Sequence, residues 1–155
     1  MEKIKLDPET SALILIDLQH GIVALETSPH PASSVVAKAA SLAATFRKHN
    51  SPAIYVRVDL ANMLQVPADR SHDDFKNPPP AIASELVPAS GVQAGDLVVT
   101  KRHWSAFSGT DLEERLKRAG VKTVVIGGIC NQSFFSFNDF HKPCNHPNLY
   151  RRLLF

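Results

Sequence analysis

Three residue types in this sequence could together activate a nucleophile: a carboxylate, an ammonium and a thiol. Asp17, Lys101 and Cys130 supply these groups, and each stands at the end of, or shortly after, a short apolar run of the chain. An ammonium beside a thiol favours the thiolate, and a nearby carboxylate can accept the proton that the thiol loses. If the fold brings the three together, the chemistry they predict is attack by an activated cysteine.

Each residue also has an ordinary explanation from its position alone. From its position, Asp17 is as readily a helix N-cap or turn residue as a catalytic one. Lys101 fits a solvated surface position, since lysine is mostly exposed. Cys130 fits a buried packing residue, because free cysteine is among the most buried residue types.

Four apolar runs, at residues 12–16, 53–58, 97–100 and 123–126, are typical of strands buried on both faces of a parallel sheet. Between the first two runs, apolar residues recur at helical spacing through residues 34–49, at Val35, Ala39, Leu42 and Phe46. The polar, proline-rich stretch 59–95 is expected to be a long loop with a short helix near residues 82–86.

A second helix is expected to begin at Thr110. Thr110 and Glu113 have the spacing of a capping box, and Gly120 is placed to end the helix. The alternation of strands and helices predicts a three-layer α-β-α fold with a mostly parallel, Rossmann-like sheet and right-handed crossovers.

In such sheets ligands bind beyond the carboxyl ends of the strands. Asp17, Lys101 and Cys130 fall at those ends, as do Arg57 and Asp59, so all five are predicted to cluster. Trp104 and Phe107 could line an apolar substrate pocket, although core packing explains them as well. His20 and His103 lack metal-ligand spacing, so no metal is assigned.

Composition excludes several function classes. The chain has 155 residues and is 44% hydrophobic, enough for one globular domain with a core. Its net charge of +2 comes from scattered residues, so we expect neither nucleic-acid nor membrane partners. Two cysteines without a CxxC pair, and a first apolar run too short for a signal or spanning helix, indicate a reduced, cytoplasmic protein.

Three segments taken together resemble the isochorismatase-like cysteine hydrolase superfamily, which includes isochorismatases, nicotinamidases and N-carbamoyl amidohydrolases. They are ALILIDLQHGI at 12–22, VVTKRHWSAFSGTDLEERLKRAGV at 98–121 and TVVIGGIC at 123–130. The resemblance implies a hydrolase without a cofactor that acts on a small molecule and assembles as a homo-oligomer, a dimer or larger. We therefore divide the chain into a partial hydrolase domain, 1–130, and an atypical tail, 131–155.

The resemblance also implies roles for single residues. Asp17 becomes the general base, and Lys101 orients Asp17 or supports developing negative charge. Phe107 lies near the substrate pocket, and backbone N–H groups near Gly128, Ile129 and Cys130 hold the oxyanion of an acyl-transfer reaction. Cysteine-type chemistry would hydrolyse the C–N bond of an amide or carbamoyl compound, whereas isochorismatase-type chemistry would hydrolyse a vinyl ether.

The third member of the family's triad is where the sequence departs from the pattern. The family motif G-[IV]-[AC]-T-[ND]-x-C-V corresponds here to GICNQSFF, residues 128–135. An ungapped alignment places Phe134 at the nucleophile position, and an alignment with one residue missing places Ser133 there. Cys130 is therefore the candidate nucleophile only if it acts from a shifted position.

The tail itself shows neither a helical stripe nor a buried strand, so we expect the sheet to be incomplete at its C-terminal end, short by about a third of the family's strands. Deleting one nucleotide within the Asn131–Gln132 codons would restore the family's Thr-Asn, which makes truncation or a frame shift after Cys130 a hypothesis. A non-catalytic homologue, with residues 123–126 as an unprotected edge strand, is the alternative to an enzyme.

Overall fold

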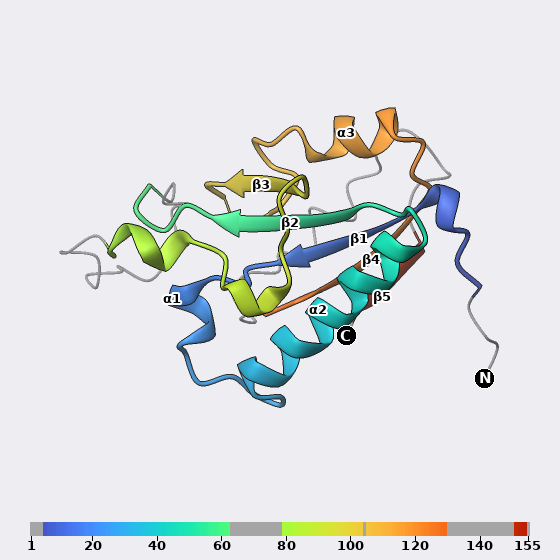
Figure 1. The fold of residues 1–155 in the computed structure, drawn as a ribbon. Helices are drawn as coiled ribbons and strands as arrows, with labels where there is room; N and C mark the ends of the chain where they lie inside the picture. The colour runs from blue at the N-terminus through green and yellow to red at the C-terminus, as the bar shows by residue number, and fades with distance from the viewer. Residues whose placement is uncertain (1–4, 63–78, 104, 130–150, 155) are drawn as a thin grey trace.

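The computed structural model describes residues 5–62, 79–103, 105–129 and 151–154 (Figure 1). A parallel sheet with the strand order β3-β2-β1-β4-β5 forms its centre. The strands are β1 (Ser11–Ile16), β2 (Ala53–Val58), β3 (Leu97–Lys101), β4 (Thr123–Gly128) and β5 (Arg151–Leu154). Trp104 and Cys130, both predicted site residues, lie outside the described residues.

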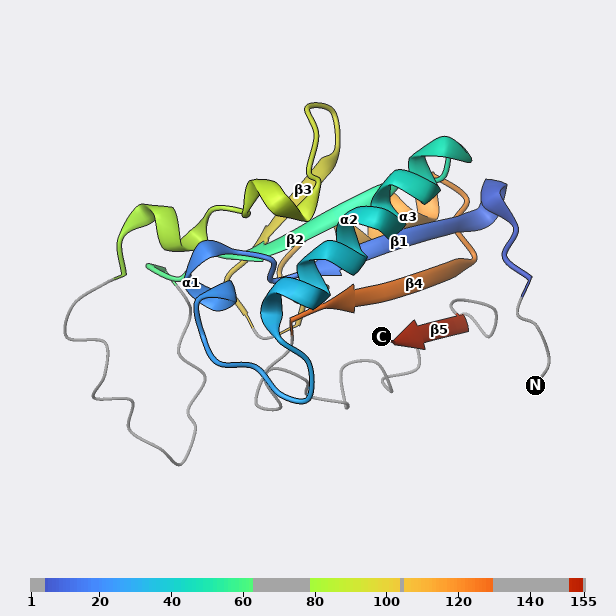
Figure 2. The same ribbon diagram turned by 60° about the horizontal axis from the view of Figure 1, so that its bottom comes forward.

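Helices cover both faces of this sheet. They are α1 (His20–Val23), α2 (Ala32–Lys48) and α3 (Leu112–Arg118), with 3₁₀ turns η1 (Pro8–Thr10), η3 (Ala81–Ser84) and η4 (Pro88–Ser90). Figures 1 and 2 show α2 and α3 on opposite faces, while α1 lies beside the arrowheads of the central strands. The predicted three-layer α-β-α fold is confirmed.

Burial on both faces of the central strand β1 explains the unbroken apolar run at residues 12–16, which follows the polar Ser11. All six of its residues are buried. Leu13 and Leu15 belong to the core cluster on the α2 side, and Ile14 and Ile16 belong to the cluster on the α3 side. Because successive side chains of a strand point to opposite faces, a strand covered on both faces buries nearly all of its side chains and is therefore mostly apolar.

Helix α2 lies close to its predicted position, beginning two residues earlier and ending one residue earlier. Ala39 and Phe46 are buried as predicted. Val36 and Ala43 are also buried, whereas Val35 and Leu42 are only partly buried at the margin of the same cluster. The buried stripe is thus made largely of alanine, which lets the helix approach the sheet closely.

The start of α3 differs from the prediction. The helix begins at Leu112, with Asp111 as its N-cap residue, and not at Thr110. Thr110 instead donates its hydroxyl to the Ala106 carbonyl at 2.6 Å and accepts a long bond from the Leu112 N–H at 3.4 Å, so its side chain stabilises the turn before the helix. Gly120 ends α3 as predicted, with φ +69° and the paired backbone bonds of a Schellman motif.

Two further predictions need correction. Lys101 is the last residue of strand β3, so its side chain extends from the strand itself and not from the loop that follows. The tail was expected to hold no strand, yet β5 pairs with β4 in parallel, so β4 is not an edge strand in this structure. Two arginines and a very short apolar run concealed β5, because four residues are too few for a hydrophobic pattern to be distinctive.

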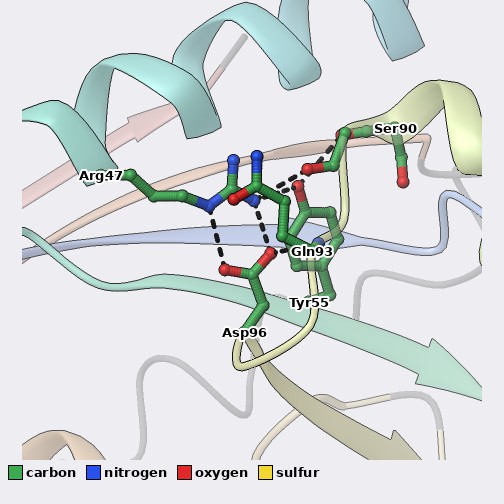
Figure 3. Close-up of polar contacts among 6 residues, drawn as sticks. Arg47, Tyr55, Ser90, Gln93 and Asp96 are labelled. Atoms are coloured by element: carbon green, nitrogen blue, oxygen red, sulfur yellow. Dashed lines mark hydrogen bonds and ion pairs between the residues drawn. The ribbon is translucent and has the colours of Figure 1, made fainter.

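At the amino ends of the strands, a buried polar network fixes the chain before β3 (Figure 3). Arg47 of α2 makes a bidentate ion pair with Asp96 and donates to the Gly91 carbonyl at 2.8 Å. Tyr55 of β2 donates its hydroxyl to the Ser90 carbonyl at 3.0 Å. Helix, strand and loop are therefore held together at the end of the sheet opposite the predicted site.

Gly128, the last residue of β4, permits a close approach to the backbone of β1. Its φ is +136°, and a Cβ atom built on it would lie 2.1 Å from the carbonyl oxygen of Ile16. Gly120 also has a positive φ, +69°, but open space surrounds its Cβ position. A side chain at Gly128 would therefore meet a steric clash, whereas at Gly120 only the backbone conformation favours glycine.

Gly128→Ala is expected to lower the free energy of unfolding by about 3 kcal/mol or more, since the methyl group must displace the β1 backbone. Gly120→Ala is the matched control and is expected to cost about 1–2 kcal/mol, the penalty of a left-handed alanine. Urea denaturation of both variants measures the difference. Equal losses would show that the contact with Ile16 imposes no constraint.

Candidate active site

The two charged residues of the predicted site meet at the carboxyl edge of the sheet. Asp17 follows β1 directly and Lys101 ends β3, so β2 lies between their strands. The Lys101 Nζ donates to Asp17 Oδ2 at 3.1 Å. Only 3% of Asp17 and 2% of Lys101 is exposed, so the pair is shielded from water.

The backbone at Asp17 turns sharply to bring about this contact. Its φ is +60°, a left-handed conformation that aspartate tolerates better than most residues but that still costs about 1–2 kcal/mol. Its N–H donates to the Val56 carbonyl at 2.9 Å, the last backbone bond from β1 to β2. Asp17 is therefore a turn residue. It is not a helix N-cap, because Gln19 occupies the N-cap position of α1.

The electrostatics of Asp17 combine two opposing effects. Burial raises the pKa of its carboxyl above the ordinary value of 3.8, and the neighbouring Lys101 ammonium opposes this rise. Within the described part of the chain, the second carboxylate oxygen, Oδ1, is buried and accepts no hydrogen bond. A buried oxygen of this kind is an available proton acceptor.

Gly128 and Ile129 lie beside the turn at Asp17. Gly128 is in register with Ile16, and the Ile129 N–H donates to the Ile16 carbonyl at 3.2 Å. Because that N–H is already bonded, it is not free to hold an oxyanion as we expected. The Ile129 side chain packs into the core cluster on the α2 side.

Phe107 belongs to the segment that precedes α3. It is partly buried against the core cluster on the α3 side, which also contains Ala106 and Ile16. Its position therefore agrees with core packing. A contact between Phe107 and substrate stays a prediction.

Arg57 and Asp59 were expected to join the site, but the structure pairs them elsewhere. Arg57 forms an ion pair with Glu85 at 2.7 Å, and Asp59 lies 3.5 Å from Arg102. Glu85 and Arg102 are more than half exposed. Both pairs are therefore partly exposed, unlike the buried contact between Asp17 and Lys101.

Sequence reasoning missed Gln19. This residue is fully buried, and its side-chain amide bonds to the backbone of Val58 in both directions. The only available signal was a polar residue two positions after Asp17, shortly beyond a strand that ends in an apolar run. Such a residue is either exposed in a loop or buried with partners, and the sequence does not distinguish the two.

Neither a metal cluster nor a spanning helix occurs in the described ranges. No three His, Cys, Asp or Glu side chains gather there in a way that could hold a metal ion. None of the helices there has the length and apolar character needed to cross a bilayer.

Lys101→Met is expected to raise the pKa of Asp17 further, because burial remains while the neighbouring positive charge is lost. NMR titration of the Asp17 carboxyl carbon measures this shift. Arg102→Met is the matched control, since it removes an adjacent cation that pairs with Asp59 and is 61% exposed. An Asp17 titration that Lys101→Met leaves unchanged would contradict the proposed coupling.

The raised pKa also predicts how stability depends on pH. Because the folded-state pKa of Asp17 exceeds the unfolded one, its stabilising contribution is complete below pH 3.8 and is lost as pH rises through the folded pKa. The double variant Asp17→Asn/Lys101→Met lacks this loss, so its stability should gain on that of the parent as pH rises from about 4 to about 7.

Urea denaturation across this pH range tests the sign, with Leu116→Ala as a core variant that leaves Asp17 unchanged. The difference between Leu116→Ala and the parent should not follow the titration of Asp17. If the free energy of unfolding of the double variant falls relative to that of the parent as pH rises, folding lowers the Asp17 pKa.

Comparison with known proteins shows which family this chain matches. The isochorismatase domain family matches residues 11–133. YwoC of Bacillus subtilis (strain 168), an uncharacterized isochorismatase family protein, is 42% identical over 132 residues, which are 83% of this chain and 68% of that protein.

Solved structures agree with this match. An isochorismatase family protein from Burkholderia thailandensis is 38% identical, with a TM-score of 0.78 over 96% of this chain and 77% of that one. An N-carbamoylsarcosine amidase from Thermoplasma acidophilum shares the fold at 21% identity, with a TM-score of 0.66 over 94% of this chain and 80% of that one. The chain belongs to the isochorismatase family of isochorismatase-like hydrolases.

Proposed function

We propose that this chain hydrolyses the C–N bond of a small amide or carbamoyl compound without a cofactor, with Asp17 as the general base. The observation that carries the proposal is the buried carboxylate of Asp17. One of its oxygens accepts from Lys101 and the other accepts no hydrogen bond from the described residues. The fold of the chain is shared with an N-carbamoylsarcosine amidase, which supports this reaction class as chemistry that the architecture can host.

Asp17 and Lys101 divide the acid–base work between them. Lys101 fixes Oδ2, so the carboxylate presents Oδ1 to the proton of an incoming nucleophile. Burial raises the pKa of Asp17, which makes the carboxylate a stronger base than a solvated aspartate. The Lys101 ammonium opposes this rise, because it stabilises the ionised carboxylate, the form that accepts a proton.

The covalent steps then balance as follows. Asp17 takes the proton of a thiol, and the sulfur attacks the carbonyl carbon of the substrate to form a tetrahedral oxyanion. The C–N bond breaks, and the leaving nitrogen takes the proton back from Asp17. Water then gives its proton to Asp17 and attacks the thioester. The acid is released as the C–S bond breaks, and the departing sulfur takes the proton back from Asp17, which restores the thiol and the carboxylate.

The proposed nucleophile is Cys130, whose role rests on its place in the sequence because it lies outside the described residues. It follows Ile129, whose backbone is bonded to the residue immediately before Asp17. Chain continuity therefore supports a thiol near the base. Ser133, the residue that one alignment with the family motif puts at the nucleophile position, is the competing candidate.

Ammonia release from a panel of primary amides and N-carbamoyl compounds tests the proposal. Asp17→Asn should lower kcat by about 100-fold or more, since a positioned general base contributes at least that much. Asp59→Asn is the matched control, because Asp59 lies at the same edge of the sheet but near Arg102, and it should retain activity. Full activity in Asp17→Asn would refute the assignment of the base.

A second pair of variants identifies the nucleophile. Cys130→Ala should abolish ammonia release and Ser133→Ala should preserve it, and mass spectrometry of the denatured acyl-enzyme should place the adduct on Cys130. The reverse pattern would assign the reaction to a serine. Turnover of a vinyl ether without ammonia release would favour isochorismatase-type chemistry, and a cooperatively folded chain inactive on both classes would favour a non-catalytic homologue.

A further inference from the structure

Gln19 has a bonding pattern that its position in a loop does not require. Its Nε2 donates to the Val58 carbonyl at 2.8 Å, and its Oε1 accepts from the Val58 N–H at 2.7 Å. The side chain is completely buried, so water does not compete for these bonds. Both ends of the amide are thus committed to one residue, the last of β2.

This amide replaces a missing part of the β1–β2 ladder. The backbone register of the two strands ends at Ile16 and Val56, followed by the bond from the Asp17 N–H to the Val56 carbonyl. The left-handed turn at Asp17 then carries the chain away from β2. The side chain of Gln19 instead bonds to the next N–H and carbonyl on this side of β2, which would otherwise be buried without partners.

Val58 is also the residue against which Lys101 is registered. The two are partners in the β2–β3 ladder, and the Asp59 N–H donates to the Lys101 carbonyl at 2.9 Å. The end of β2 therefore bonds on one side to Gln19, two residues from Asp17, and on the other side to the backbone of Lys101. The turn at Asp17 is thus connected to the backbone of Lys101 through Gln19, Val58 and Asp59.

The main chain on either side of Gln19 is fixed as well. The Val87 N–H donates to the Leu18 carbonyl at 2.9 Å, and the His20 N–H donates to the Glu85 carbonyl at 3.0 Å. Gln19 itself forms an isolated antiparallel bridge with Leu86. The turn after Asp17 is therefore clamped between β2 and residues 85–87, with Gln19 in the middle.

We propose that Gln19 is a positioning residue, which sets the separation of the Asp17 carboxylate and the Lys101 ammonium through its two bonds to Val58. Its importance for catalysis rests on the proposed function, whereas its effect on the ion pair does not. If the Gln19 bonds are lost, the turn at Asp17 can move relative to the end of β2, and the stabilisation of the Asp17 carboxylate by Lys101 weakens.

The test is the pKa of Asp17, measured by NMR titration of its carboxyl carbon in Gln19→Met. Methionine has a similar length and volume but makes neither bond, so the carboxyl stays buried while its contact with Lys101 loosens. The expected result is a higher Asp17 pKa than in the parent. Where amide hydrolysis is measurable, kcat should fall by up to about 100-fold with KM little changed, because only the reacting groups are displaced.

Tyr55→Phe is the matched control. It also removes a buried side-chain bond made by β2, the one from its hydroxyl to the Ser90 carbonyl, but at the opposite end of the sheet. A general loss of stability would affect both variants, whereas the Asp17 pKa should rise only in Gln19→Met. Should Gln19→Met fail to fold, Gln19→Asn keeps an amide that is too short to reach both groups of Val58 and should shift the pKa in the same direction.

An unchanged Asp17 pKa in a folded Gln19 variant would overturn the proposal and leave Gln19 a purely structural residue. This outcome is independent of turnover, so it is distinguishable from a failure of the proposed function. An Asp17 pKa that rises in a chain inactive on every substrate would support the positioning role while rejecting the hydrolase.

Discussion

The buried contact between Asp17 and Lys101 is the interaction around which the carboxyl edge of this sheet is built. Removing a carboxylate and an ammonium from water is costly, and their mutual attraction offsets that cost only when the geometry is good. The pair therefore demands that two residues from non-adjacent strands be held in register across β2. Most of the unusual features of the described structure serve this demand.

Backbone strain, close contact and a buried ion pair occur together at this edge. Asp17 has a left-handed backbone, and a Cβ atom on Gly128 would lie 2.1 Å from the Ile16 carbonyl oxygen. Backbone strain of this kind persists only where the surrounding structure over-determines it, which is typical of functional sites. A left-handed backbone also occurs at Asn50, ahead of β2. The carboxyl edge is therefore distinguished by the combination of strain with the buried Asp17–Lys101 contact, and not by strain alone.

The sequence predicted the features that depend on hydrophobic pattern. The strands β1, β2 and β4 coincide with largely apolar runs because most of their residues are buried, and periodicity located α2 to within two residues. The contact between Asp17 and Lys101 followed from topology, since parallel strands end at one edge. The sequence did not predict features decided by single hydrogen bonds, namely the start of α3, where Thr110 bonds to Ala106, and the partners of Gln19.

The Asp17–Lys101 pair and the proposed nucleophile come from different parts of the chain. β1, β2 and β3, with Gln19 between them, are sufficient to define the positions of Asp17 and Lys101. β4 contributes through Gly128 and Ile129, whose contacts are with the backbone of Ile16 and not with either charged side chain. A change in the residues after β4 therefore alters the group that is deprotonated while leaving the proposed base and its ammonium partner in place. On this view the departure from the family motif after Cys130 concerns the proposed nucleophile, whereas the contact between Asp17 and Lys101 is formed by residues that precede it.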